Sequence, residues 1–201
     1  MGAMPTTART THLLYLHGFR SSPQSMKAQK MAQWVQQAHP QVHWWCPQLP
    51  PSPQAAMELV LQGTADWPKG HTVVIGSSLG GFYAQCFAAA TGCRAVLLNP
   101  AVEPARDLAH HVGLQQAWHD PNQSFYFQPD YVDELTQLQS TLQATRPATF
   151  AIVAQGDEVL RWEEMVSHLP HAQIKLLEGS DHALSDFDTH RQDILDFLNL
   201  V

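Results

Sequence analysis

Short runs of apolar residues recur along the chain, and each run has the length of a β-strand. Within the runs Val, Ile, Leu and aromatic residues follow one another directly, whereas a half-exposed strand would alternate apolar with polar positions. Continuous apolar strands are typical of a parallel sheet that is covered on both faces. We therefore predict central strands at residues 13–17, 42–49, 73–77, 95–101, 149–157 and 174–179.

The segments between these strands have helical periodicity, with apolar residues three or four positions apart. Alternating strands and helices predict an α/β fold with a mostly parallel sheet of about six strands, in which right-handed crossovers place helices on both faces. The chain has 201 residues, the size of one domain, which we place at 12–201. The predicted helices are 24–38, 53–62, 79–90, 161–169 and 185–200.

One interval, 102–147, is too long for a single crossover. It contains two helix-like patterns on either side of an aromatic, turn-prone stretch that reads HDPNQSFYFQPDYV. Insertions of this kind in compact domains are more often lids or binding segments than structureless loops. We predict a short lid here, and the alternative is a decorated crossover with a small hydrophobic cluster of its own.

Charge and composition exclude several classes of protein. Lys and Arg total 11 against 18 Asp and Glu, so the net charge is −7, and we expect no binding to nucleic acid. No stretch approaches 18 consecutive apolar residues and no signal peptide is visible, so we expect neither a membrane span nor export. Three cysteines without a CxxC pair favour a reducing cytoplasm.

A glycine-rich motif points to chemistry. Residues 76–81 read GSSLGG, and Gly76, Ser78 and Gly80 satisfy G-x-S-x-G in one frame only. An apolar strand runs into the motif and a helical segment runs out of it, which is the context that a nucleophile elbow requires. The phosphate-binding patterns G-x-x-x-x-G-K and G-x-G-x-x-G are absent from the chain. We therefore predict Ser78 as a nucleophile, and the alternative is an ordinary Gly-Ser turn.

A serine hydroxyl becomes a good nucleophile when a histidine takes its proton and an acid orients that histidine. In this type of site the acid and then the histidine follow the serine along the chain. We select His182 because it follows a predicted strand at the carboxyl end, where open α/β sheets place their sites. The competing histidines lie in helical patterns or at a strand entrance: His168, His171 and His190.

Asp157 is the predicted acid because it directly follows the apolar strand TFAIVAQG, again at a carboxyl end. Its neighbour Glu158 is the alternative. Asp181 is adjacent to His182, and neighbouring side chains usually point apart, so we do not assign it this role.

The negative oxygen of a tetrahedral intermediate needs two N–H donors. The amide after the nucleophile, that of Leu79, is the first. The second is expected from the loop after the first strand, where Gly18 allows a tight turn that directs the Phe19 N–H toward the site. We expect His17 to shape this loop rather than to act as a base.

Five motifs along the chain read LLYLHGFRSSPQSMKA, VIGSSLGGFYA, LLNPAVEP, QGDEVL and a final DH. Together they resemble the small bacterial α/β-hydrolase esterases of the YqiA/YcfP-like family. The resemblance implies a minimal α/β-hydrolase fold without the first two antiparallel strands of larger relatives, and hydrolysis of carboxylic esters or thioesters. It also implies the same catalytic residues, Ser78, Asp157 and His182, and the same oxyanion donors, Phe19 and Leu79.

The substrate pocket is predicted from position. Arg20 follows the oxyanion loop and either forms an ordinary surface ion pair or binds an anionic part of the substrate. Aromatic residues of the predicted lid are expected to wall an acyl pocket, above all Phe125 and Phe127, together with Trp118, Tyr126 and Tyr131. We expect no cofactor. We also expect no metal at His110, His111 and His119, because His110 and His111 project about 100° apart on a helix and cannot easily share one ion.

The sequence therefore predicts a serine hydrolase that cleaves short- to medium-chain esters or thioesters through an acyl-enzyme, with a small molecule as its partner. One alternative is an acyltransferase with the same acyl-enzyme. The other is a non-catalytic binding module with a hydrolase fold. The oligomeric state does not follow from the sequence.

Overall fold

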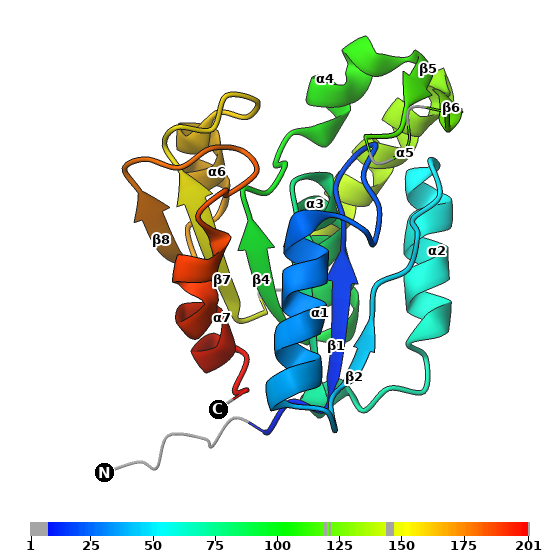
Figure 1. Ribbon diagram of the computed structural model, residues 1–201. Coiled ribbons are helices and arrows are strands. Elements are labelled where there is room, and N and C mark those ends of the chain that lie inside the picture. The colour runs from blue at the N-terminus through cyan, green and yellow to red at the C-terminus, as the bar shows by residue number, and fades with distance from the viewer. Residues whose placement is uncertain (1–7, 119, 121, 144–146, 201) are drawn as a thin grey trace.

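The computed structural model describes residues 8–118, 120, 122–143 and 147–200. Its centre is a six-stranded sheet in which every pair of neighbouring strands is parallel. This confirms the predicted α/β class and the number of central strands (Figure 1). The strands lie in the order β2 (His43–Trp45), β1 (His12–Leu16), β3 (Thr72–Ser77), β4 (Arg94–Leu98), β7 (Thr149–Ala154) and β8 (Gln173–Leu177).

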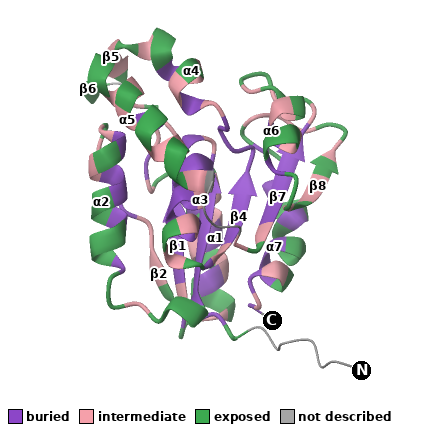
Figure 2. Ribbon diagram, turned by 180° about the vertical axis from the view of Figure 1, so that it is seen from behind, coloured by how far each residue is buried: buried purple, intermediate pink, exposed green. Residues whose placement is uncertain are grey.

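Helices cover both faces of the sheet, as Figures 1 and 2 show from opposite sides. Successive strand residues point to opposite faces, so in β3 Val73 and Ile75 join one hydrophobic cluster and Val74 joins the other. All six residues of β3 are buried, which accounts for its unbroken apolar sequence. Helices α1 (Met26–Ala38) and α7 (Arg191–Phe197) cover one face, and α2 (Pro53–Gly63), α3 (Leu79–Thr91), α5 (Pro129–Ser140) and α6 (Trp162–His168) cover the other.

Two elements are shorter than the sequence pattern predicts. Strand β2 is the edge strand and pairs only along three residues of β1, and Pro47 and Pro50 beyond it lack the N–H that a longer ladder would need. The C-terminal helical pattern begins as a 3-10 turn, Phe187–His190, before α7. Other 3-10 turns are Lys69–His71, Ala109–His111 and Thr141–Gln143.

The interval 102–147 forms two helices, α4 (Pro104–Leu108) and α5, joined through an antiparallel hairpin. The hairpin strands are β5 (Gly113–Gln116) and β6 (Ser124–Phe127), which the sequence analysis did not predict. The sequence of β5, GLQQ, has no alternation of apolar and polar residues that would have indicated a strand. Helix α4 and the hairpin lie beyond the carboxyl ends of the central strands, as Figure 1 shows.

The approach of α3 to β3 is so close that it requires a glycine. A Cβ atom on Gly76 would lie 2.0 Å from the Gly80 carbonyl oxygen and 2.7 Å from the Ala84 Cβ atom. The first of these neighbours is backbone and cannot rotate away, so the whole helix would have to shift.

We expect Gly76→Ala to lower the free energy of unfolding by at least about 3 kcal/mol, because overpacking here displaces α3. Gly70→Ala is the matched control, since a Cβ atom there would meet nothing within 4 Å. Urea denaturation measures both variants. Equal stability of the two would contradict the close contact between α3 and β3.

Candidate active site

Ser78 lies on a strained turn between β3 and α3. Its φ of 56° and ψ of −122° fall in a region that residues with a Cβ rarely adopt. The turn is held by the backbone: Ser78 N–H donates to the Leu98 carbonyl at 3.0 Å, and the Ser78 carbonyl accepts from Gly81 and Ala101 at 2.8 and 3.0 Å. The surrounding backbone therefore presents the serine side chain at the carboxyl edge of the sheet.

The structure brings Ser78, His182 and Asp157 together in one hydrogen-bonded line. His182 Nε2 lies 3.0 Å from Ser78 Oγ, and His182 Nδ1 lies 2.7 Å from Asp157 Oδ2. The three residues come from the ends of β3, β8 and β7, which meet at the same edge of the sheet. The Asp157 side chain is fully buried and that of His182 is 20% exposed.

The carboxylate of Asp157 is fixed by its own loop. Its Oδ1 accepts hydrogen bonds from the Val159 and Leu160 amides, both at 2.8 Å, which leaves Oδ2 for the histidine. Glu158 lies differently: its Oε2 accepts from the backbone N–H of His182 at 3.0 Å. The geometry therefore favours Asp157 over Glu158 as the group that orients the imidazole.

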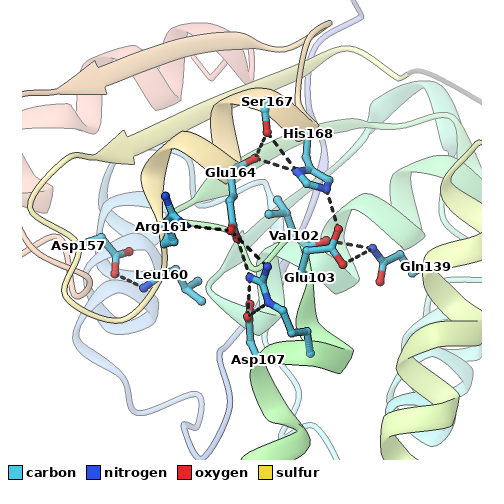
Figure 3. Close-up of polar contacts among 11 residues, drawn as sticks. Val102, Glu103, Asp107, Gln139, Asp157, Leu160, Arg161, Glu164, Ser167 and His168 are labelled. Atoms are coloured by element: carbon cyan, nitrogen blue, oxygen red, sulfur yellow. Dashed lines mark hydrogen bonds and ion pairs between the residues drawn. The ribbon is translucent and has the colours of Figure 1, made fainter.

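Helix α6, which follows the Asp157 loop, is joined to the insertion by charged side chains (Figure 3). Glu164 pairs with Arg106 of α4 at 2.6 Å, and hydrogen bonds from that guanidinium lower the pKa of the carboxylate. His168 Nε2 lies 2.7 Å from the Glu103 carboxylate just before α4. These contacts connect the acid-bearing segment to the insertion above the sheet.

Asn99 connects the loop that bears His182 to the strand that precedes Asp157. It is fully buried and has a φ of 41°. Its Nδ2 donates to the carbonyls of Asp181 and His182 at 3.0 and 3.2 Å, and its Oδ1 accepts from Ala154 N–H at 2.8 Å. Asn99 was not predicted as a site residue, although a polar residue within the predicted apolar strand 95–101 was a usable signal.

The loop after β1 lies against Ser78. A Cβ atom on Gly18 would be 3.2 Å from the Ser78 Cβ atom and 3.7 Å from its Oγ, so the Phe19 amide begins beside the serine. Leu79 is the first residue of α3, where an amide has no intrahelical acceptor. His17 is buried and shapes this loop: its Nε2 accepts from Leu49 N–H at 3.0 Å, and its Nδ1 therefore donates to the Gly18 carbonyl.

A cavity of about 680 Å³ opens beside Phe19 and Leu79. Phe125 and Arg20 line it, whereas Trp118, Tyr126 and Tyr131, which were also expected to wall the pocket, do not. Phe127 does not line it: its ring is fully buried, with centroids 5.2 Å from Phe19 and 5.5 Å from Tyr131, so it supports the wall from behind. Further lining residues are Leu49, Pro50, Pro51, Ala55, Leu59, Tyr83, Ala117, Gln123 and Ser124.

Within the described part of the chain, no three His, Cys, Asp or Glu side chains converge as metal ligands. His119, considered with His110 and His111 above, lies outside the described residues. No helix among the described residues combines the length and apolar character needed to span a bilayer.

Comparison with protein families identifies the family of this chain. The model of the Uncharacterised protein family (UPF0227) matches residues 12–199. The chain belongs to this family. UPF0227 is the family of the YqiA/YcfP-like proteins, so the resemblance seen in the five sequence motifs is confirmed.

Solved structures with low sequence identity to this UPF0227 protein share its fold. Est1E from Butyrivibrio proteoclasticus has a TM-score of 0.72 at 13% identity, covering 94% of this chain and 89% of its own. Alpha/beta hydrolase domain-containing protein 10 from mouse has 0.69 at 13%, covering 94% and 91%. The Pyrococcus furiosus esterase Pf2001 has 0.65 at 12%, covering 96% and 81%. The fold is therefore that of the α/β-hydrolases.

Lys27 of α1 contacts the loop that bears His182. Its Nζ donates to the Ala183 carbonyl of that loop at 2.5 Å. Burial lowers the pKa of Lys27 to about 8, although the nearby Asp181 and Asp157 act in the opposite direction. An unfolded chain would keep this proton up to its ordinary pKa of 10.5. The folded protein therefore binds fewer protons than the unfolded chain between these two values.

We expect the free energy of unfolding to rise with pH between about 8 and 10 through this group, by at most about 1.4 kcal/mol per pH unit. Lys27→Met removes that contribution, so the free energy of unfolding of the wild type should rise relative to that of the variant as the pH rises. Urea unfolding of both proteins at several pH values measures it. Parallel curves would show that Lys27 keeps its ordinary pKa.

Proposed function

We propose that this protein is a serine hydrolase that cleaves carboxylic esters or thioesters. The observation that carries the proposal is the line from Ser78 Oγ through the His182 imidazole to the Asp157 carboxylate, at 3.0 and 2.7 Å. Both distances allow proton transfer and orientation without rearrangement. The names of two structural neighbours, Est1E and the esterase Pf2001, support the same class of reaction.

The first half of the reaction forms an acyl-enzyme. His182 Nε2 takes the proton of Ser78 Oγ as that oxygen attacks the carbonyl carbon of the ester. The carbonyl oxygen becomes negative and accepts hydrogen bonds from the Phe19 and Leu79 amides. When the tetrahedral intermediate collapses, the bond to the leaving oxygen or sulfur breaks, and the leaving group receives the proton from His182.

The second half returns the enzyme to its starting state. A water molecule gives one proton to His182 as its oxygen attacks the acyl carbon, and Ser78 Oγ leaves with the proton from His182. Throughout, Nδ1–H of His182 donates to Asp157 Oδ2, which keeps Nε2 as the acceptor nitrogen and stabilises the imidazolium.

Hydrolysis is favoured over the two alternative functions. The His182 side chain is partly exposed, so water has access to the acyl-enzyme, whereas transfer to another acceptor needs a dry site. A binding module would not need the doubly hydrogen-bonded Asp157 or the strained φ of Ser78. Product analysis with added alcohols or thiols separates hydrolysis from acyl transfer.

The setting of the reaction follows from the same features. We propose a small ester as the substrate and no role in binding nucleic acid, because the net charge is −7. The three cysteines are free thiols, two of them buried, which supports a cytoplasmic location.

We propose that the insertion 102–147 is a lid over the acyl group. Ala117, Gln123, Ser124 and Phe125 of its hairpin form one wall of the cavity beside the oxyanion donors. Leu49, Pro50 and Leu59 also line the cavity, together with the polar Gln48, Glu58 and Gln62, so an acyl chain there would contact apolar groups of both the hairpin and the segment 48–62. Because the insertion has only 46 residues and much of it forms α4 and α5, we expect a pocket that holds short- to medium-chain acyl groups.

Ser78→Ala should lower kcat/KM for an activated aryl ester by about 10⁴-fold or more while the protein remains folded, because the nucleophile is lost. Asp157→Asn should cost a similar factor through loss of the correct histidine tautomer. Glu158→Gln is the control: its amide oxygen still accepts from His182 N–H, so less than a tenfold loss is expected. Purified Ser78→Ala enzyme with normal turnover would refute the assignment.

Phe125→Ala should shift the preferred neutral ester to longer acyl chains, because it enlarges the cavity. Each buried CH₂ is worth about 0.8 kcal/mol, close to a fourfold gain in kcat/KM. Tyr126→Ala is the matched control, since Tyr126 is 52% exposed on the opposite face of β6 and does not line the cavity. A series of aryl esters from acetyl to decanoyl measures the profile. An unchanged profile in Phe125→Ala would assign the hairpin a purely structural role.

A further inference from the structure

Arg20 stands at the boundary between the oxyanion loop and the cavity. It follows Phe19 directly and lines the cavity together with Gly18 and Phe19. Its backbone has a φ of 60°, a left-handed conformation that is unfavourable for a residue with a Cβ. The loop therefore turns sharply at this residue, which lines the same cavity as the predicted oxyanion donors Phe19 and Leu79.

The guanidinium of Arg20 is held in one place by the insertion. Its Nε donates to the Gln116 carbonyl of β5 at 2.6 Å. Its Cζ lies 4.1 Å from the centroid of the Trp118 ring, and the Trp118 amide donates to the Arg20 carbonyl at 2.8 Å. These contacts use one nitrogen and one face of the guanidinium, and they leave the two terminal nitrogens for another partner.

No carboxylate of the described residues lies within ion-pair distance of Arg20. Arg106, by contrast, pairs with both Asp107 and Glu164. Glu58 also lines the cavity, but its Oε1 accepts from Gln54 Nε2 at 3.0 Å along α2. Arg20 is therefore a fixed cation that lines the cavity and has no carboxylate partner among the described residues, although the chain has 18 acidic side chains, so its terminal nitrogens can bind an anionic ligand.

We propose that Arg20 binds a carboxylate on the acyl part of the substrate, so that the preferred substrates are monoesters of dicarboxylic acids. The inference rests on the ester hydrolysis proposed above. The two terminal N–H groups of a guanidinium match the two oxygens of a carboxylate, and such pairs are among the strongest hydrogen bonds in proteins. Because Arg20 is already held by Gln116 and Trp118, it loses little conformational freedom on binding. The apolar walls contact the methylene groups between the ester and the carboxylate.

The test compares matched pairs of methyl esters: monomethyl succinate, glutarate and adipate against methyl butanoate, pentanoate and hexanoate. Free acid and methanol are quantified by chromatography, with the Ser78→Ala protein as the blank. The measured quantity is the ratio of kcat/KM for the anionic ester to that for its neutral partner. We expect this ratio to exceed one in the wild type for at least one pair, and to fall about tenfold to hundredfold in Arg20→Gln.

Two further variants sharpen the result. Arg20→Lys keeps the charge without the paired N–H groups, so it should retain part of the ratio. Arg191→Gln is the matched control, because Arg191 also lies over a tryptophan, Trp34, with its Cζ 5.3 Å from the ring, but on the other face of the sheet. It removes the same charge and should change the ratio less than twofold.

The outcomes separate the two proposals. If Arg20→Gln lowers kcat/KM for both esters equally, Arg20 only anchors the hairpin and the inference is wrong. A wild-type ratio below one for all three pairs also overturns it, while the proposed hydrolase activity stands. If the wild type cleaves no ester above the Ser78→Ala blank, the proposed function itself fails.

Discussion

The site depends on how closely α3 approaches the strands beneath it. Gly76 and Gly80 allow backbone atoms to meet where any Cβ atom would lie about 2 Å from a carbonyl oxygen. That approach forces the chain to reverse at Ser78, in a conformation that costs of order 1–3 kcal/mol. The cost is offset by hydrogen bonds from neighbouring strand ends to the same peptide groups, and by the fully buried strand β3. As a result the serine side chain projects beyond the edge of the sheet and the oxyanion loop lies directly against it.

Parallel strands explain why residues so distant in sequence meet here. Strands β1, β3, β4, β7 and β8 all end at the same edge, and each contributes one part: the oxyanion loop, Ser78, Asn99, Asp157 and His182. Asn99 is central to this arrangement because one amide group connects the end of β7 to both carbonyls of the histidine loop. The relative position of Asp157 and His182 is thus set by the sheet and by the buried side chain of Asn99, and not by the two loops alone.

Much of this could be predicted from the sequence because the signals were local. Unbroken apolar runs indicated parallel strands, and the strand ends then placed Ser78, Asp157 and His182 at one edge. Contacts between distant segments had no such signal. The polar sequence of β5 did not indicate a strand. The burial of Phe127 beneath Phe19 depends on the packing of the hairpin against the first loop, and the support that Lys27 gives to the histidine loop depends on where α1 lies.

The most direct measurement of the central claim is the site at which a fluorophosphonate reacts with the native protein. Such reagents phosphonylate a serine that is activated by a neighbouring base. Trypsin should release residues 70–94, which contain both Ser77 and Ser78, and fragment-ion mass spectrometry distinguishes the two. We expect one adduct per chain, on Ser78, and greatly slowed labelling in His182→Ala. An adduct on any other residue, or equal labelling in His182→Ala, would contradict it.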